Sequence, residues 1–269
     1  MRRIFFLIIL LAILTTGLLF WRGNFSQKEK NVAANSEQVS QKENIVEKKQ
    51  EEQTKSIENK VEVKENKTDK APAVRQEKIP FTSQAPTGDW NDSRFQDGCE
   101  EASIAMVIRW VQGTTFSSPQ DATQEIFDIA KFEDKTFGHH IDSSVDDAGR
   151  IFSQHYGYED FVIKKDFTLE DLRSDLEKGN ILLVPVFGQA LKNPNFTPPG
   201  PIAHMLVVVG WDEKTKEFIT NDPGTKRGDG YRYNEKILFD AIWAYPSGKN
   251  HSNPPISTKQ KAMIVIISK

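Results

Sequence analysis

The pattern of apolar and polar residues divides the chain into three stretches. Residues 4–21 form one run of apolar or weakly polar side chains, whereas residues 24–76 contain few large apolar ones. From residue 77 onward, apolar runs alternate with glycines, prolines and aromatic residues. The pattern therefore predicts an N-terminal membrane segment at 1–23, a disordered tether at 24–76 and a folded domain at 77–269.

The run at 4–21 is long enough to cross a bilayer, because its residues would form a helix of about 27 Å. Arg2 and Arg3 precede the run, and it ends at Trp21 with no small-residue cleavage site behind it. We therefore expect an uncleaved single-pass signal-anchor, with the folded domain outside the cytoplasm. The stretch at 24–76, as a coil or as a solvated helix ending before Pro72, would hold that domain away from the membrane.

Within the folded domain, the periodicity predicts helices first and strands later. Apolar positions at helical spacing predict a helix over 99–111, stopped by Gly113. Further helices are predicted at 119–132, 144–157 and 168–180, and strands at 78–84, 181–188, 203–211, 217–223 and 261–269. This order predicts an α+β fold in which N-terminal helices pack on an antiparallel sheet.

Charge and composition narrow the expected partners. The chain has a formal net charge of −3, and acidic residues outnumber basic ones in the predicted domain. Binding to a phosphate backbone needs a basic surface, so no nucleic-acid partner is expected. His139 and His140 are adjacent, with no second ligand pair at metal spacing, so we predict no metal and no cofactor. We expect a monomer.

The chain contains one cysteine, Cys99, and it opens the helix predicted at 99–111. A lone cysteine is most often a small buried hydrophobe. At a helix N-terminus, however, backbone N–H groups and the helix dipole favour the thiolate, which is the nucleophilic form. Glu100 and Glu101 follow directly and would oppose a thiolate, so we expect their side chains to point away from the sulfur.

A cysteine nucleophile needs a base, and the base needs a group that orients it. His204 lies in the strand predicted at 203–211, and taken alone it would be a core histidine bonded to a carbonyl. The strands at 203–211 and 217–223 form a hairpin, however, and its turn places His204 opposite Asp222 or within two residues of it. Opposite Cβ atoms lie about 5 Å apart. The sequence therefore predicts a set of Cys99, His204 and Asp222.

The segments "GCEEAS", "HMLVVVGW" and "NDP" resemble those of the papain-like cysteine peptidases of the double-glycine (bacteriocin-leader) peptidase-like family, the family thirty-nine-like domains. The resemblance spans residues 78–245. It implies a papain-like fold and hydrolysis of a peptide or protein substrate through a thioester acyl-enzyme. It also implies that Cys99 is the nucleophile, His204 the base and Asp222 the orienting residue, with an upstream glutamine as oxyanion donor.

Two glutamines compete for the role of oxyanion donor. Gln96 lies three residues before Cys99 in a polar turn, and Gln84 ends the strand predicted at 78–84. A donor held at the end of a packed strand is better preorganised than one in a mobile turn. The resemblance also favours the glutamine of "SQ", so we predict Gln84.

Other functions remain open for the same three residues. A Cys-His-Asp set also serves an amidase or murein hydrolase acting on cell-wall peptides. It equally serves a peptidyl transferase, in which an amine replaces water in the second step. A non-catalytic peptide-binding module is the alternative from another class, and the intact catalytic set argues against it.

Overall fold

A computed structural model describes residues 74–76, 78–248, 251–253, 255 and 260–268 of the chain. These residues belong to one compact unit, Lys70–Lys269. The predicted membrane segment at 1–23 and most of the predicted tether lie outside them. Within the described residues, no helix combines the length and apolarity that a membrane span requires.

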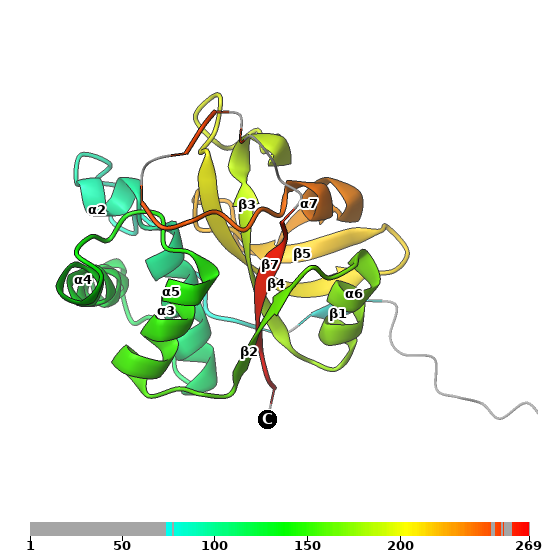
Figure 1. Cartoon of the computed structure of the whole chain (residues 1–269), viewed down its shortest axis with the longest axis horizontal. Helices are drawn as coiled ribbons and strands as arrows, with labels where there is room; N and C mark the ends of the chain where they lie inside the picture. The colour runs from blue at the N-terminus through cyan, green and yellow to red at the C-terminus, as the bar shows by residue number, and fades with distance from the viewer. Residues whose placement is uncertain (1–73, 77, 249–250, 254, 256–259, 269) are drawn as a thin grey trace, which may run out of the picture. The chain divides into compact units, whose positions relative to one another are not determined.

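A single antiparallel sheet forms the centre of the unit (Figure 1). The strand order is β2-β7-β3-β4-β5-β6, and β1 pairs with β4 outside this path. The strands are β1 (Val74–Gln76), β2 (Phe161–Lys165), β3 (Ile181–Phe187), β4 (Ala203–Asp212), β5 (Glu217–Asn221), β6 (Tyr231–Asn234) and β7 (Ala262–Ile266). The β1 residues were predicted as tether, but their pairing with β4 makes them part of the sheet.

Helices cover both faces of the sheet (Figure 1). One group is α2 (Ser93–Gln96), α3 (Cys99–Val111), α4 (Pro119–Thr136) and α5 (Val145–Arg150), which continues as a π-helical turn, η1 (Ile151–His155). The other elements are α6 (Leu169–Glu177), the 3₁₀ turn η2 (Gly188–Leu191) and α7 (Glu235–Ala241). The helices α3, α4 and α5 pack on one face, and α6 and α7 pack on the other.

The alternation of side chains along β4 shows how two cores arise from one sheet. Met205 and Val207 point into the core shared with α3, whereas Leu206 and Val208 point into the core shared with α6 and α7. Successive residues of a strand face opposite sides, so a strand covered on both sides needs apolar residues at nearly every position. This explains the continuous apolar runs of β3 and β4.

The predicted fold class is confirmed, because helices pack on an antiparallel sheet. The helix over 99–111 and the strands at 181–188, 203–211, 217–223 and 261–269 are present, with ends that shift by a few residues. A capping box between Thr168 and Asp171 opens α6. The helix predicted over 144–157 is present as α5 followed by the π-helical turn η1.

The strand predicted at 78–84 is wrong. This segment forms no strand, and Pro80 has no N–H to contribute to a ladder. It is held instead by the Asn221 side chain, which donates to the Ile79 carbonyl, and by the Gln84 N–H, which donates to the Pro223 carbonyl at 2.8 Å. The strands β2 and β6 and the helices α2 and α7 were not predicted.

Candidate active site

Cys99 is the first residue of α3, and its side chain is buried. The residue before it, Gly98, is the N-cap and provides no side-chain cap. A Cβ on Gly98 would lie 2.5 Å from the carbonyl oxygen of Arg94, which is too close for any side chain. Glycine at this position therefore lets α2 pack against the start of α3. Cys99, the next residue, then lies at the helix N-terminus.

The Cys99 thiol donates a hydrogen bond to Glu100 Oε2, with Sγ and Oε2 3.0 Å apart. The other carboxyl oxygen of Glu100 accepts a hydrogen bond from the Tyr245 hydroxyl at 2.6 Å. The prediction that Glu100 points away from the sulfur is therefore wrong. Glu100 is buried, and these two donors satisfy its carboxyl oxygens inside the protein.

This environment disfavours negative charge on the thiol. Burial raises the pKa of Cys99 well above its ordinary value, and Glu100 and Asp142 raise it further, while the backbone N–H of Met205 lowers it. Burial and the charge of Asp142 raise the pKa of Glu100 to about 8. Near neutral pH, the neutral thiol beside the protonated Glu100 is therefore the favoured form in this arrangement.

His204 and Asp222 form a buried pair on the sheet. His204 Nε2 lies 2.8 Å from Asp222 Oδ1, and the two side chains are 1% and 0% exposed. The strands pair Val207 with Asn221 and Val208 with Thr220, which continues the predicted register toward the end of the hairpin that carries these residues. The predicted imidazole–carboxylate contact is therefore present.

Three further donors hold the Asp222 carboxylate. Gly224 N–H donates to Oδ1 at 2.9 Å, and Oδ2 accepts from the Tyr233 hydroxyl at 2.5 Å and from Asn193 Nδ2 at 3.4 Å. Burial raises the pKa of Asp222, but the charge of His204 and these hydrogen bonds outweigh it and hold the pKa below its ordinary value. Sequence reasoning missed Asn193 and Tyr233, because neither belongs to a motif and both reach Asp222 only through the fold.

The two candidate glutamines occupy different environments. Gln84 is buried, and its Nε2 donates to the carbonyls of Phe95 at 2.8 Å and Gln96 at 3.1 Å, at the end of α2. Gln96 is exposed, and its Nε2 donates to the Trp90 carbonyl at 2.9 Å. Gln84 is thus the more rigidly held of the two, although it ends a loop and not a strand.

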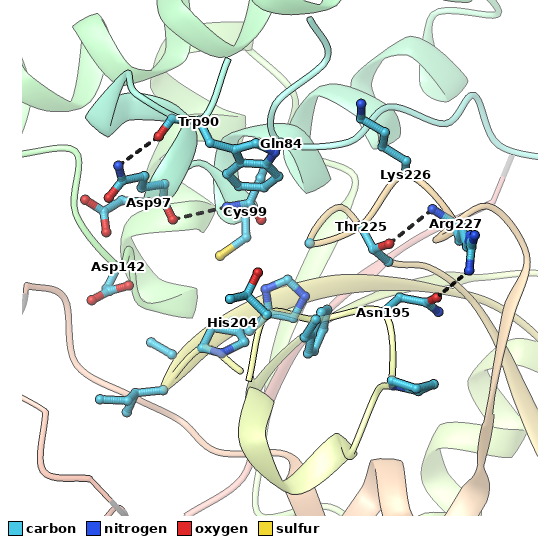
Figure 2. Close-up of a pocket in the computed structure, with 18 of the residues that line it drawn as sticks. Gln84, Trp90, Asp97, Cys99, Asp142, Asn195, His204, Thr225, Lys226 and Arg227 are labelled. Atoms are coloured by element: carbon cyan, nitrogen blue, oxygen red, sulfur yellow. Dashed lines mark hydrogen bonds between the residues drawn. The ribbon is translucent and has the colours of Figure 1, made fainter. Parts of the chain in front are cut away.

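One cavity of about 870 Å³ brings these groups together, and Cys99, His204, Gln84 and Gln96 all line it. Figure 2 shows the Cys99 sulfur directed toward the side of the cavity that carries His204. Asp222 lies behind His204 and is fully buried.

Within the described residues, no group of three or more His, Cys, Asp or Glu side chains is arranged to hold a metal ion. The arrangement supplies a thiol, an oriented imidazole and amide donors, which are the parts that acyl transfer requires.

Two of three comparisons with known proteins returned a match. Residues 76–250 match the model of a family described as Peptidase_C39 like. A crystal structure of a protein from Bacillus anthracis, described as a C39-like peptidase, aligns with a TM-score of 0.47 and 14% identity. That alignment covers 73% of this chain and 98% of the other chain. The comparison with curated proteins returned no match. Because the family model spans more than half of the sequence, the chain belongs to the Peptidase_C39 like family, a membership that indicates a cysteine peptidase.

Proposed function

We propose that this protein is a membrane-anchored, extracytoplasmic cysteine peptidase that hydrolyses peptide bonds with a Cys99-His204-Asp222 triad. The observation that best supports the proposal is the buried His204–Asp222 pair on the wall of the cavity that also contains the thiol. A histidine with only a packing role in the core is not expected to line the same cavity as a cysteine at a helix N-terminus.

In this proposal each ring nitrogen of His204 has a role. Because Nε2 is bound to Asp222, Nδ1 is the nitrogen left to take the thiol proton. The Cys99 thiolate then attacks the peptide carbonyl carbon, and the imidazolium returns the proton to the leaving amine as the C–N bond breaks. Water attacks the resulting thioester while Nδ1 accepts its proton, and the carboxylic acid product leaves as Cys99 recovers its thiol.

The thiol must exchange partners before this reaction begins. It now donates to Glu100, and proton transfer to His204 requires that hydrogen bond to break. Near neutral pH the acid and the thiol are both favoured in their neutral forms here, so no ion pair has to be separated in the exchange. Asp222 fixes the imidazole in place during this step.

Gln84 is the proposed side-chain donor of the oxyanion hole, together with the backbone N–H of Cys99. Its Nε2 is anchored beside the start of α3 through the Phe95 and Gln96 carbonyls. A primary amide has two N–H groups, and in Gln84 they face these two carbonyls. One of the N–H groups must therefore turn from its carbonyl to the oxyanion as the tetrahedral intermediate forms.

The location outside the cytoplasm rests on the apolar run at 4–21, which lies outside the described residues. Fractionation of cells that make the full chain should recover it in the membrane, with the folded domain accessible to externally added protease. Release of a soluble form that begins near residue 24 would show that the run is a cleaved signal.

The central test compares the wild-type chain with Cys99→Ser on mixed peptides and on purified cell-wall material. We expect Cys99→Ser to abolish turnover while the free energy of unfolding stays nearly unchanged, because the thiol serves chemistry and a hydroxyl is similar in size. Loss of activity together with unfolding would instead indicate a packing role for Cys99.

The products of the same assay separate the alternatives. Cleavage confined to cell-wall peptides would favour the murein hydrolase, and incorporation of an added amine would favour the transferase. A thiol-directed peptide electrophile should label Cys99 faster than it labels free cysteine. Labelling at the rate of free cysteine would favour a binding module.

A further inference from the structure

The cavity carries charges of opposite sign on the two sides of Cys99 and His204. Figure 2 shows Asp97 and Asp142 on one side of the pair and Lys226 and Arg227 on the other. These four are the only Asp, Glu, Lys or Arg residues among the described residues that line the cavity. A substrate that extends across the cysteine would therefore meet an acidic end and a basic end.

The basic end is formed by the loop between β5 and β6. Lys226 and Arg227 are exposed, and Arg227 Nη1 donates to the neutral Asn195 Oδ1 at 3.3 Å. The other arginine side chains that the structure describes each pair with a carboxylate; they are Arg94, Arg109, Arg150, Arg173 and Arg232. No ion pair among the described residues includes Lys226 or Arg227. Two positive charges therefore face the cavity without a protein carboxylate to balance them.

The acidic end contains an imidazole nitrogen without a hydrogen bond. His251 lines the cavity, and its side chain is 4% exposed. Its Nε2 lies 3.4 Å from Asp142 Oδ2 but has no hydrogen-bond partner among the described residues. Buried polar atoms of this kind are normally satisfied, so an unsatisfied one that borders a cavity points to a ligand.

The surroundings of His251 suit a cationic ligand. The ring packs against Trp243 and Tyr245, with ring centroids 5.3 and 5.8 Å apart. Burial lowers the pKa of His251, so the ring is neutral near neutral pH and can accept a hydrogen bond from an ammonium group. The negative charge of Asp142 also reaches Cys99, because it contributes to the raised pKa of the thiol.

We infer that the cleft selects a peptide that carries a carboxylate on one side of the scissile bond and an ammonium group on the other. Lys226 and Arg227 bind the carboxylate, and Asp142 with His251 binds the ammonium group. An arginine fork matches a carboxylate in geometry as well as in charge. A bound ammonium group would also offset the negative charge beside Cys99 and so favour the thiolate. The inference rests on the proposed peptidase function and names its substrate class.

The test uses five peptides that share one scissile sequence. Four place Glu or Gln on one side and Lys or Gln on the other, and the fifth exchanges the positions of Glu and Lys. We expect one Glu–Lys order to have a kcat/KM about tenfold or more above the doubly neutral peptide, a factor typical of a few exposed ion pairs. The advantage should shrink as salt is added, because exposed charges are screened.

Variants of the charged cavity residues show which side chains cause the increase in kcat/KM due to Glu and which cause the increase due to Lys. Lys226→Gln with Arg227→Gln should remove only the gain from Glu, and Asp142→Asn should remove only the gain from Lys. Lys214→Gln and Asp240→Asn are the matched controls, because both residues are exposed and lie outside the cavity, and neither should change the ranking. Equal kcat/KM for all five peptides, or a variant effect that is the same for every peptide, would overturn the inference.

A binding measurement keeps this inference separate from the peptidase proposal. The same five peptides can be titrated calorimetrically into the Cys99→Ser protein, which binds without turnover. A charge preference in binding supports the inference even where the wild-type chain cleaves none of the peptides, in which case the peptidase proposal fails. Equal affinity for all five peptides overturns the inference, whatever the wild-type activity is.

Discussion

The two walls of the cavity each place a buried carboxyl group beside a reactive side chain, yet the two carboxyl groups differ in charge. On the sheet wall, Asp222 contacts His204, and its pKa is held below the ordinary value. On the helix wall, Glu100 contacts Cys99, and its pKa is raised to about 8. Burial favours the neutral acid in both places, so burial alone does not explain the difference.

The donors around each carboxyl group explain it. Asp222 receives hydrogen bonds from an imidazole, a hydroxyl, an amide and a backbone N–H, whereas Glu100 receives them from a thiol and the Tyr245 hydroxyl. Glu100 also lies near the negative charge of Asp142. Enough donors together with a basic partner keep a buried carboxylate ionised, and the lack of them makes it an acid. The sheet wall thus holds an oriented imidazole beside an ionised carboxylate, whereas the helix wall holds the thiol in its neutral form.

The largest expected effect comes from removing the base on the preorganised wall. His204→Ala should lower kcat by on the order of 10⁴, the upper range for general acid–base catalysis, because Glu100 does not replace an oriented imidazole. Steady-state kinetics on a cleaved peptide measures this loss. If Glu100 were the working base, His204→Ala would retain most of the activity, and the distinction between the two walls would fail.

A smaller loss is expected for Asp222→Asn, because an amide oxygen can still orient the ring of His204. The loss should nevertheless reach about 10²-fold in kcat, because Tyr233 and Asn193 both donate to this position and an amide N–H₂ group would oppose them. The free energy of unfolding should fall as well. A loss equal to that of His204→Ala would mean that the carboxylate charge itself, and not only its orienting role, is essential.

The sheet wall could be predicted from the sequence, whereas the environment of the helix wall could not. The hairpin turn lies between His204 and Asp222, and counting residues around it brings the two together with little dependence on the rest of the fold. Tyr245 meets Glu100 across 145 positions of sequence, and that contact depends on how the segment after α7 packs. The direction of Glu100 was therefore predicted wrongly, because nothing local to the "GCEEAS" segment identifies its partner.

The same distinction between local and distant contacts applies to the fold. The long apolar strands β3 and β4, the helix α3 with its apolar face, and the side-chain-capped helices α4 and α6 each have a local sequence pattern, and they were predicted. The short strands β2 and β6 lie at the edges of the sheet and carry mixed polar and apolar residues, so their periodicity is weak. The segment at 78–84 looks like a strand by alternation, but it lacks a partner strand.

An effect of similar size is expected at the oxyanion donor. Gln84→Ala should lower kcat by about 10² to 10³, whereas Gln96→Ala should change it only slightly. Gln84 also binds the Phe95 and Gln96 carbonyls, so a purely structural role has to be separated from a catalytic one. Alkylation of Cys99 by iodoacetamide forms no oxyanion and should proceed at the wild-type rate in Gln84→Ala. Slower alkylation, or the reverse ranking of the two glutamines, would contradict the assignment.

The smallest expected effect comes from Glu100→Gln on the helix wall, which removes the carboxyl group beside Cys99. Burial is the largest cause of the raised pKa of Cys99, and the charge of Glu100 and its hydrogen bond with the thiol follow. Glu100→Gln removes that charge and leaves burial in place, so the pKa of the thiol should fall only in part. Because Glu100 ionises with a pKa of about 8, its charge opposes the thiolate only at alkaline pH, and there iodoacetamide should alkylate Cys99 of Glu100→Gln several-fold faster than Cys99 of the wild-type chain.

Glu101→Gln is the matched control for this change, because Glu101 is also buried, lies one residue further along α3 and has a pKa raised first by burial and then by Glu133. Cys99 does not donate to Glu101, so the pH profile of alkylation should stay close to that of the wild type. An unchanged profile in Glu100→Gln would mean that burial alone sets the reactivity of the thiol, and an equal shift in both variants would mean that direct contact with the thiol is not what matters. The contact between Glu100 and the thiol would then not account for the difference between the two walls.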